Sequence, residues 1–157
     1  MNAETQNLAN HLRAHPFFKD LSEAHLAMLT ECAMPTSFAA GDKIFTEGEV
    51  ANRFYLIESG EVVLTAETTP HEHTDVQVLK AGDVLGWSWL FPPYYWNFSA
   101  VASTPIEAIF FYGTRLREQC EQDPALGYEL LKRVSKIVIG RLQKTRQELL
   151  KSKSKNQ

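Results

Sequence analysis

The spacing of hydrophobic positions along the chain predicts helices at both ends and short strands between them. Apolar residues recur at helical spacing from Leu8, and this first helix is expected to stop at Pro16, because proline disfavours the helical conformation of the residue before it. Ser22 is a suitable cap for a second helix, which is expected to end near Pro35.

From residue 37 to residue 112 the pattern is that of short strands separated by glycine-containing turns. The segment Arg53–Glu58 carries apolar residues at successive rather than alternate positions, so we expect a strand that is buried on both faces. The polar segment Thr68–Thr74 is expected to form a loop. Turn signals about every eight to twelve residues are typical of a sandwich, a barrel or a jelly roll. The expected strands are 43–47, 53–58, 61–66, 76–79, 98–102 and 106–112.

Asp123 and Pro124 begin a long C-terminal helix, with aspartate as the cap and proline in the first turn. The helix is expected to reach about Lys151, and residues 152–157 are expected to form a disordered tail. Its apolar residues can be read as one broad stripe that packs on the chain's own body. We favour a parallel helix pair in a homodimer, because a helix of about 28 residues is longer than a small domain can cover. The predicted dimerisation residues are Leu131, Val134, Val138, Leu142, Thr145 and Leu149.

The size and composition of the chain suit one globular domain with a helical appendage. Its 157 residues are 44% hydrophobic and 22% charged, which fits a domain over residues 1–122 followed by the helix at residues 123–151. No apolar run approaches the ~18–20 residues that span a bilayer, and the N-terminus lacks the pattern of a signal peptide. We therefore expect a cytoplasmic protein that does not enter the membrane.

Charge is distributed unevenly along the chain. From Asp123 onward nine lysines and arginines accompany three acidic residues, whereas the preceding part has an excess of about nine negative charges. The basic helix surface is expected either to dock on acidic surface of the body or to stay free for an acidic protein partner.

Aromatic residues are concentrated between Lys80 and Ser103, where all three tryptophans lie. Three interpretations are open: a ligand-free plug that fills the core, a pocket for a flat apolar or aromatic effector, and a patch that docks a partner protein.

Three glycine-punctuated motifs follow one another along the chain. They are F-x-x-G-D-x-I-F-x-E-G-E at Phe38–Glu49, F-Y-L-I-E-S-G-E-V at Phe54–Val62 and A-G-D-V-L-G at Ala81–Gly86. In this order and spacing they resemble the cyclic nucleotide-binding sensor domain of the catabolite-activator and fumarate–nitrate-regulator (Crp/Fnr) superfamily, over roughly residues 17–150. The resemblance implies a mainly β protein with α-helices: a double-stranded β-helix, or cupin-like jelly roll, flanked by N-terminal helices and a long C-terminal dimerisation helix.

The phosphate-binding cassette of this family is altered in the present chain. The resemblance implies a glutamate for the ribose hydroxyl and an arginine for the cyclic phosphate, but Trp87 and Trp96 stand at these positions and Asn97 replaces a hydroxyl residue. Thr145 matches the helix threonine that can reach the base. Each lost charge-assisted hydrogen bond is worth about 1.5–3 kcal/mol, so cyclic nucleotides are expected to bind on the order of a thousandfold more weakly. The candidate ligand-binding residues are Gly86, Trp87, Ser88, Trp89, Leu90, Trp96, Asn97, Ser99 and Thr145.

The sequence carries no arrangement of residues typical of an enzyme, so neither catalysis nor a cofactor is expected. His71 and His73 are interpreted as exposed loop residues rather than metal ligands, and His11, His15 and His25 as surface residues. Cysteines 32 and 120 lie far apart in the sequence and are interpreted as free thiols.

We therefore expect a stand-alone regulatory sensor domain that responds to another small ligand or to a protein partner. The alternatives are a ligand-free interaction module and the sensor half of a transcription regulator cut before its DNA-binding domain. Because no helix-turn-helix segment follows the long helix before Gln157, specific DNA binding is not expected.

Overall fold

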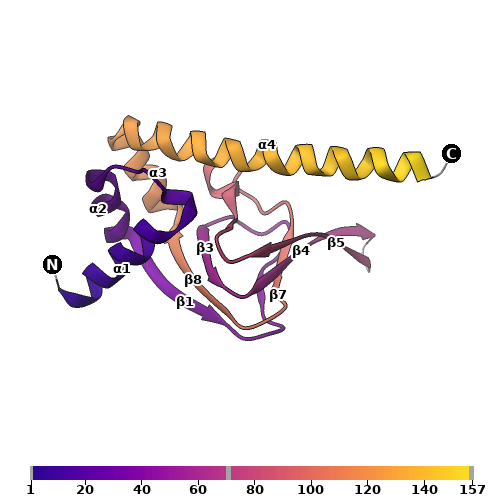
Figure 1. Ribbon diagram of the computed structural model, residues 1–157, viewed down its shortest axis with the longest axis horizontal. Coiled ribbons are helices and arrows are strands. Elements are labelled where there is room, and N and C mark those ends of the chain that lie inside the picture. Colours follow the sequence, from indigo (N-terminus) through magenta and orange to yellow (C-terminus); the bar gives the residue numbers. More distant parts are fainter. Residues whose placement is uncertain (1, 70–71, 156–157) are drawn as a thin grey trace. The chain divides into compact units, whose positions relative to one another are not determined.

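The computed structural model describes residues 2–69 and 72–155. In this part of the chain two antiparallel β-sheets form a jelly roll (Figure 1). Within these residues the strand order is β1-β8-β3-β6 in one four-stranded sheet and β2-β7-β4-β5 in the other. The predicted fold class is confirmed. The strands are β1 (Ala33–Phe38), β2 (Lys43–Phe45), β3 (Arg53–Ser59), β4 (Glu61–Thr69), β5 (Glu72–Lys80), β6 (Val84–Leu85), β7 (Ser99–Ala102) and β8 (Ile106–Tyr112).

Strand β3 is buried on both faces, as its sequence predicts. Tyr55 and Ile57 point into the core between the sheets, which they share with residues of β4, β7 and β8. Phe54 lies on the opposite face, where its ring is 5.4 Å from Phe17 and 6.1 Å from Phe111. Because side chains alternate between the two faces of a strand, one continuous apolar run supplies both layers.

The N-terminal helices cover the face of the first sheet that carries Phe54. They are α1 (Ala3–Ala14), the short 3₁₀ helix η1 (Pro16–Phe18) and α2 (Glu23–Cys32). Figure 1 shows α1 and α2 at the end of the sheets beside β1 and β8. Phe18 is 1% exposed and makes an edge contact with Phe111 of β8 at 6.1 Å.

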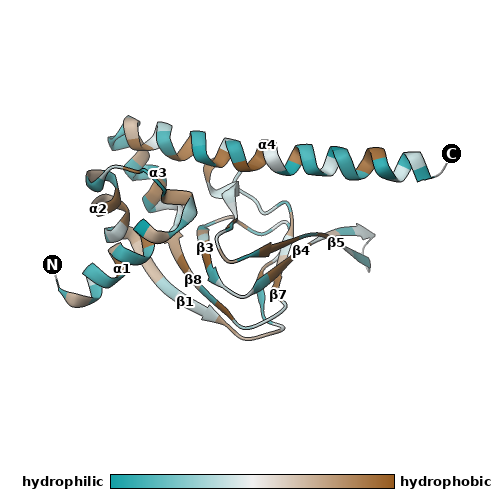
Figure 2. Ribbon diagram, in the orientation of Figure 1, coloured by the Kyte–Doolittle hydropathy of each residue, from teal (hydrophilic) through white to brown (hydrophobic). Residues whose placement is uncertain are grey.

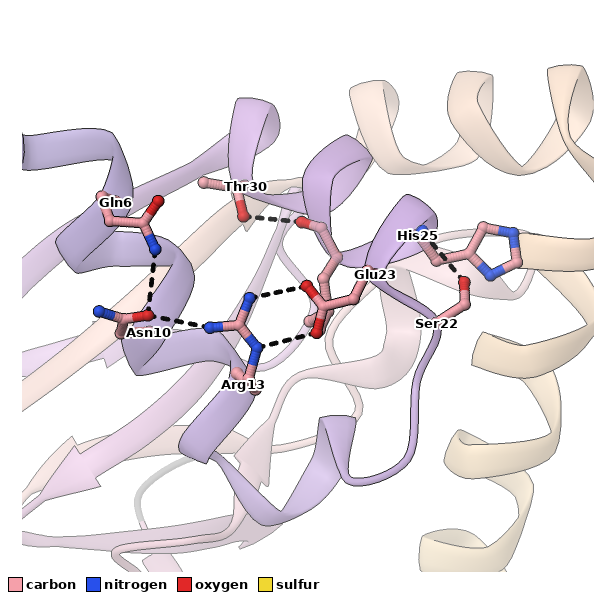
Figure 3. Close-up of polar contacts among 8 residues, drawn as sticks. Gln6, Asn10, Arg13, Ser22, Glu23, His25 and Thr30 are labelled. Atoms are coloured by element: carbon pink, nitrogen blue, oxygen red, sulfur yellow. Dashed lines mark hydrogen bonds and ion pairs between the residues drawn. The ribbon is translucent and has the colours of Figure 1, made fainter. Parts of the chain in front are cut away.

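Polar contacts fix the two N-terminal helices to each other (Figure 3). The guanidinium of Arg13 donates to both carboxylate oxygens of Glu23, at 3.0 and 2.8 Å, and to Asn10 at 2.9 Å. The hydroxyl of Ser22 accepts a hydrogen bond from the amide of His25 at 3.2 Å. The predicted N-cap of the second helix is therefore confirmed.

His15 is a core residue, so its interpretation as a surface residue was wrong. Its side chain is 6% exposed; Nδ1 accepts a hydrogen bond from the amide of Phe17, and Nε2 donates to the carbonyl of Ile57, each at 3.2 Å. Burial lowers the pKa of His15, although the Ile57 carbonyl and the nearby charges of Glu58 and Asp83 oppose this shift. The folded chain therefore favours the neutral form of the His15 imidazole.

We expect the free energy of unfolding to decrease as the pH falls below about 6.5, because the unfolded chain then takes up a proton that the buried imidazole resists. This contribution of His15 reaches at most about 1.4 kcal/mol per pH unit. It should disappear in a His15→Gln variant and persist in a His73→Gln control, whose histidine is exposed. Urea unfolding at a series of pH values measures the slopes, and equal slopes in the two variants would contradict the prediction.

Three local predictions differ from the structure. The second helix ends at Cys32 and the chain continues as strand β1, in which Pro35 is tolerated because β1 lies at a sheet edge. The polar segment expected to be a loop is the outer part of a β4–β5 hairpin, where Glu67 pairs with His73; His71 lies outside the described residues. Helix α3 (Gly113–Gln122) was not predicted.

The second compact unit, residues 120–157, consists mainly of α4 (Pro124–Lys155). A carboxylate oxygen of Asp123 accepts a hydrogen bond from the amide of Leu126 at 3.3 Å, which confirms the predicted cap. The helix continues to Lys155 rather than ending near Lys151. The disordered tail predicted from residue 152 is therefore wrong up to Lys155, since lysine and serine impose no break on a helix that is already formed.

Hydrophobic residues interrupt the hydrophilic surface of α4 along its length (Figure 2). Among the predicted dimerisation residues, Val134 is buried in the single chain, Val138 is half-buried, and Leu131, Leu142 and Leu149 are exposed. Their role in pairing with a second copy stays a prediction. Among the described residues, no helix combines the length and the apolar character that crossing a bilayer requires.

Candidate functional site

The cassette begins where β6 ends, at Gly86. This glycine has a φ of 87° and precedes the 3₁₀ helix η2 (Trp87–Leu90). A left-handed backbone of this kind favours glycine. Pairing of Leu85 with Tyr55 attaches the cassette to β3 and so places Gly86 beside the core between the sheets.

Trp96 occupies the space over Gly86. A Cβ atom added to Gly86 would lie 2.7 Å from two atoms of the Trp96 ring. The indole also stacks on Phe45, with 3.9 Å between ring centroids and 12° between ring planes. At 5% exposure, Trp96 is a core side chain. The position that the family resemblance gives to a phosphate-binding arginine is thus held by an apolar ring packed against the cassette glycine.

Trp89 anchors the other side of η2. It is fully buried, and its ring lies 5.6 Å from that of Phe54. Arg117 of α3 donates a hydrogen bond to the carbonyl of Trp89, and its guanidinium lies 4.2 Å from the ring of Tyr94. The indole nitrogen of Trp89 has no hydrogen-bond partner within the described part of the chain. These contacts hold η2 in place.

The remaining cassette residues predicted from sequence are spread between core and surface. Ser88 and Ser99 are buried, and the hydroxyl of Ser99 accepts a hydrogen bond from the amide of Glu47 at 2.9 Å. Trp87 and Leu90 are half-buried, and Asn97 is exposed. Thr145 belongs to the second unit, where its hydroxyl donates to the carbonyl of Arg141 at 2.9 Å. The Ser99 hydroxyl thus joins β7 to the backbone at Glu47, and its part in ligand binding stays a prediction.

The aromatic side chains between Lys80 and Ser103 are divided between the core and the surface. Trp89 and Trp96 fill the core, whereas Phe91 is 41% and Tyr95 50% exposed. Tyr95 forms an isolated β-bridge with Val50, which is also exposed. Trp89 and Trp96 thus have the burial expected of a plug, the flanking aromatics lie at the surface, and the choice among the three interpretations stays a prediction.

A pocket that the sequence analysis missed is lined in part by Trp96 and Phe45. It has a volume of ≈ 320 Å³, within the range of small-molecule sites. Its charged members are Arg53 and Glu49, of which Arg53 is half-buried and Glu49 exposed. The complete lining is Ile44, Phe45, Glu49, Val50, Asn52, Arg53, Tyr55 and Trp96.

The thiols and possible metal ligands do not form a second site. Burial raises the pKa of the Cys120 thiol to about 11, with Asp123 and Glu121 adding to the shift, and burial also raises the pKa of Cys32. Both thiols are therefore protonated near neutral pH. In the described ranges no three histidine, cysteine, aspartate or glutamate residues lie close enough to hold a metal ion.

The sequence model of the cyclic nucleotide-binding domain matches residues 35–123, which span the jelly roll and α3, so the chain belongs to this family. Two proteins with similar sequences are a transcriptional regulator and a protein kinase. Over 132 residues the chain is 26% identical to the CRP-like cAMP-activated global transcriptional regulator of Mycobacterium tuberculosis, covering 84% of the chain and 57% of that regulator. It is 35% identical over 83 residues to the cGMP-dependent protein kinase isozyme 1 of Drosophila melanogaster, covering 52% of the chain and 11% of the kinase.

Among solved structures, a putative cyclic nucleotide-binding protein from Geobacter metallireducens is similar over nearly its whole length. The TM-score is 0.78 and the identity 30%, with 90% of this chain and 99% of that chain covered. The family and the jelly-roll architecture predicted from the three sequence motifs are thus confirmed.

Proposed function

We propose that this chain is a regulatory sensor domain that does not bind cyclic AMP or cyclic GMP tightly. It works as a homodimer through α4 and responds to another small ligand or to a protein partner. The observation that carries the proposal is the packing of Trp96, which stacks on Phe45 and lies directly over Gly86.

The electrostatics of the cassette support this reading. A cyclic phosphate in the family position would meet the indole of Trp96 instead of a guanidinium, and a ribose hydroxyl would meet Trp87 instead of a carboxylate. Burying a phosphate without a compensating cation costs several kcal/mol. A nucleotide would also have to displace Trp96 from its stacked position, and an aromatic pair of this kind contributes about 0.5–1.5 kcal/mol beyond its buried area.

Calorimetric titration with cyclic AMP and cyclic GMP is expected to give dissociation constants weaker than about 100 μM. A Trp87→Glu/Trp96→Arg variant, which restores the two charged groups, should bind more tightly than the wild-type chain. A Trp87→Ala/Trp96→Ala variant is the matched control, since it opens the same space without adding charge. Micromolar affinity in the wild-type chain would overturn the proposal.

A ligand-free interaction module is the second candidate function. It is favoured by the exposed apolar side chains of Val50, Phe91 and Tyr95, two of which are joined by a β-bridge. The exposed basic residues of α4, among them Lys144 and Arg146, suit an acidic protein partner. A small molecule that binds the folded chain raises its melting temperature, so ligand-dependent thermal shift separates a sensor from such a module.

A further inference from the structure

His15 joins the N-terminal helices to the first sheet. It is the residue between α1 and η1, and its side chain is 6% exposed. Nδ1 accepts a hydrogen bond from the amide of Phe17, and Nε2 lies 3.2 Å from the carbonyl oxygen of Ile57 in β3. A backbone amide can only donate, so Nδ1 carries no proton and the single proton of the neutral ring lies on Nε2. One tautomer of the neutral imidazole therefore satisfies both contacts.

The carbonyl of Ile57 also holds the turn that leads into the cassette. It accepts a hydrogen bond from the amide of Gly82 at 3.0 Å, and the amide of Ile57 donates to the carbonyl of Asp83 at 3.0 Å. A Cβ atom added to Gly82 would lie 3.4 Å from the ring of Pro16, so η1 rests on this turn. The turn is followed directly by β6 and the cassette. The contacts around His15 thus connect the N-terminal helices to the entrance of the cassette.

A second proton on the His15 ring is incompatible with these contacts. The new N–H at Nδ1 would face the N–H of Phe17, so two donors would meet where one hydrogen bond now lies. The buried position would also deprive a full positive charge of water. The imidazolium is therefore more stable outside the buried site than within it.

The charged groups around His15 come from three elements. Glu58 of β3 and Asp83 of the turn both favour the imidazolium, but burial outweighs them and lowers the pKa of His15. The carboxylate of Glu58 is hydrogen-bonded to Nδ1 of His11 in α1. A carboxylate oxygen of Asp83 accepts a hydrogen bond from the amide of Lys80 at 2.8 Å. Both carboxylates are thus engaged by other groups.

We propose that His15 is a proton-sensitive catch between the N-terminal helices and the entrance of the cassette. With a neutral ring η1 is held on β3; when the ring takes up a proton, η1 separates from β3 and the turn at Gly82 loosens. The jelly roll stays folded, because η1 belongs to neither sheet and its opening breaks no pairing between strands. This inference goes beyond the proposed sensor function and does not depend on which ligand or partner the chain responds to.

Hydrogen exchange of the full chain, followed by NMR between about pH 7.5 and about pH 5, tests the proposal. After correction for the intrinsic rate, protection of the amides of Phe17, Phe18 and Gly82 should fall about 3- to 30-fold from about pH 6.5 to about pH 5, since one pH unit contributes at most about tenfold. Val63 and Leu64 of β4 pair with both neighbouring strands and should change less. An equal fall in β4, or constant protection at Phe17 and Gly82, overturns the inference.

Two variants without a titrating group check that His15 is responsible. His15→Asn can still cap the amide of Phe17, and His15→Gln is the longer amide. In either folded variant the additional pH dependence at Phe17 and Gly82 should disappear. His11→Gln is the matched control, because His11 lies one turn earlier in α1 and contacts Glu58; it should keep the effect. A wild-type response in both His15 variants, or its loss in the His11 variant, contradicts the assignment.

The ring of His15 gives an independent check in the wild-type chain. At about pH 7.5 its nitrogen NMR shifts should be those of a neutral ring with the proton on Nε2. The amide of Phe17 should show a scalar coupling to Nδ1 across the hydrogen bond, and this coupling should disappear over the pH range in which protection falls. A charged ring at about pH 7.5, or a proton on Nδ1, overturns the inference.

Discussion

Replacing Leu142 by glutamate is expected to convert the proposed dimer into monomers. Leu142 is 67% exposed in the single chain and lies seven residues before Leu149, which is also exposed. In a parallel two-fold pair each residue of the seam lies close to its own copy, so one substitution introduces two facing carboxylates. An uncompensated charge in a dry interface costs about 3–5 kcal/mol, which weakens association by at least about a hundredfold.

Sedimentation equilibrium over a range of concentrations measures this change directly. Gln143→Glu is the matched control, because Gln143 is an exposed neighbour on the same helix and the substitution changes the charge equally. The control should remain a dimer. A wild-type chain that is already monomeric, or a Leu142→Glu variant with unchanged mass, would show that α4 is not the dimer interface.

Replacing Gly60 by alanine is expected to destabilise the fold by about 2–5 kcal/mol, from a strained backbone and a steric overlap together. Gly60 joins β3 to β4 with a φ of 95°. An added Cβ would overlap the backbone carbonyl of Pro105 and lie 2.6 Å from the side chain of Ile106, which belongs to the core. The carbonyl is part of the backbone, so relief of the overlap requires the chain before β8 to move.

Gly41 provides the control for this prediction. Its φ is 91°, but a Cβ added there would have no neighbour within 4 Å. Gly41→Ala therefore carries the backbone strain without the overlap, and it should cost about 1–2 kcal/mol. Denaturant unfolding of the two variants gives the difference, and equal losses of stability would show that the contact with Pro105 is not responsible.

The regular parts of the fold were predictable because several local signals agreed. The continuous apolar run of β3 indicated burial on both faces, and the caps Ser22 and Asp123 were placed correctly. The outer part of the β4–β5 hairpin was missed because backbone hydrogen bonds hold it together. Its side chains are polar and exposed, so they carry no hydrophobic signal.

The candidate site was predictable only in part. The motif ending at Gly86 located the cassette, and the replacement of its charged residues by Trp87 and Trp96 was visible in the sequence. The position of the Arg53 guanidinium over two aromatic rings could not be predicted, because an arginine at the start of a strand is most often a solvated residue. Its relation to Phe110 and Tyr112 comes from the pairing of β3 with β8. Strands distant in sequence create that contact, and no local pattern encodes it.

The edges of the two sheets have a consequence for solubility. An unpaired strand edge is a site where another chain can add a strand and begin a fibre. Here β2 and β6 are three and two residues long, β1 contains Pro35, and β5 carries charged residues at positions such as Glu72 and Asp75. Each of these features blocks the addition of a further strand. Even at high concentration the chain should therefore resist β-type aggregation, and its self-association is left to helical surface.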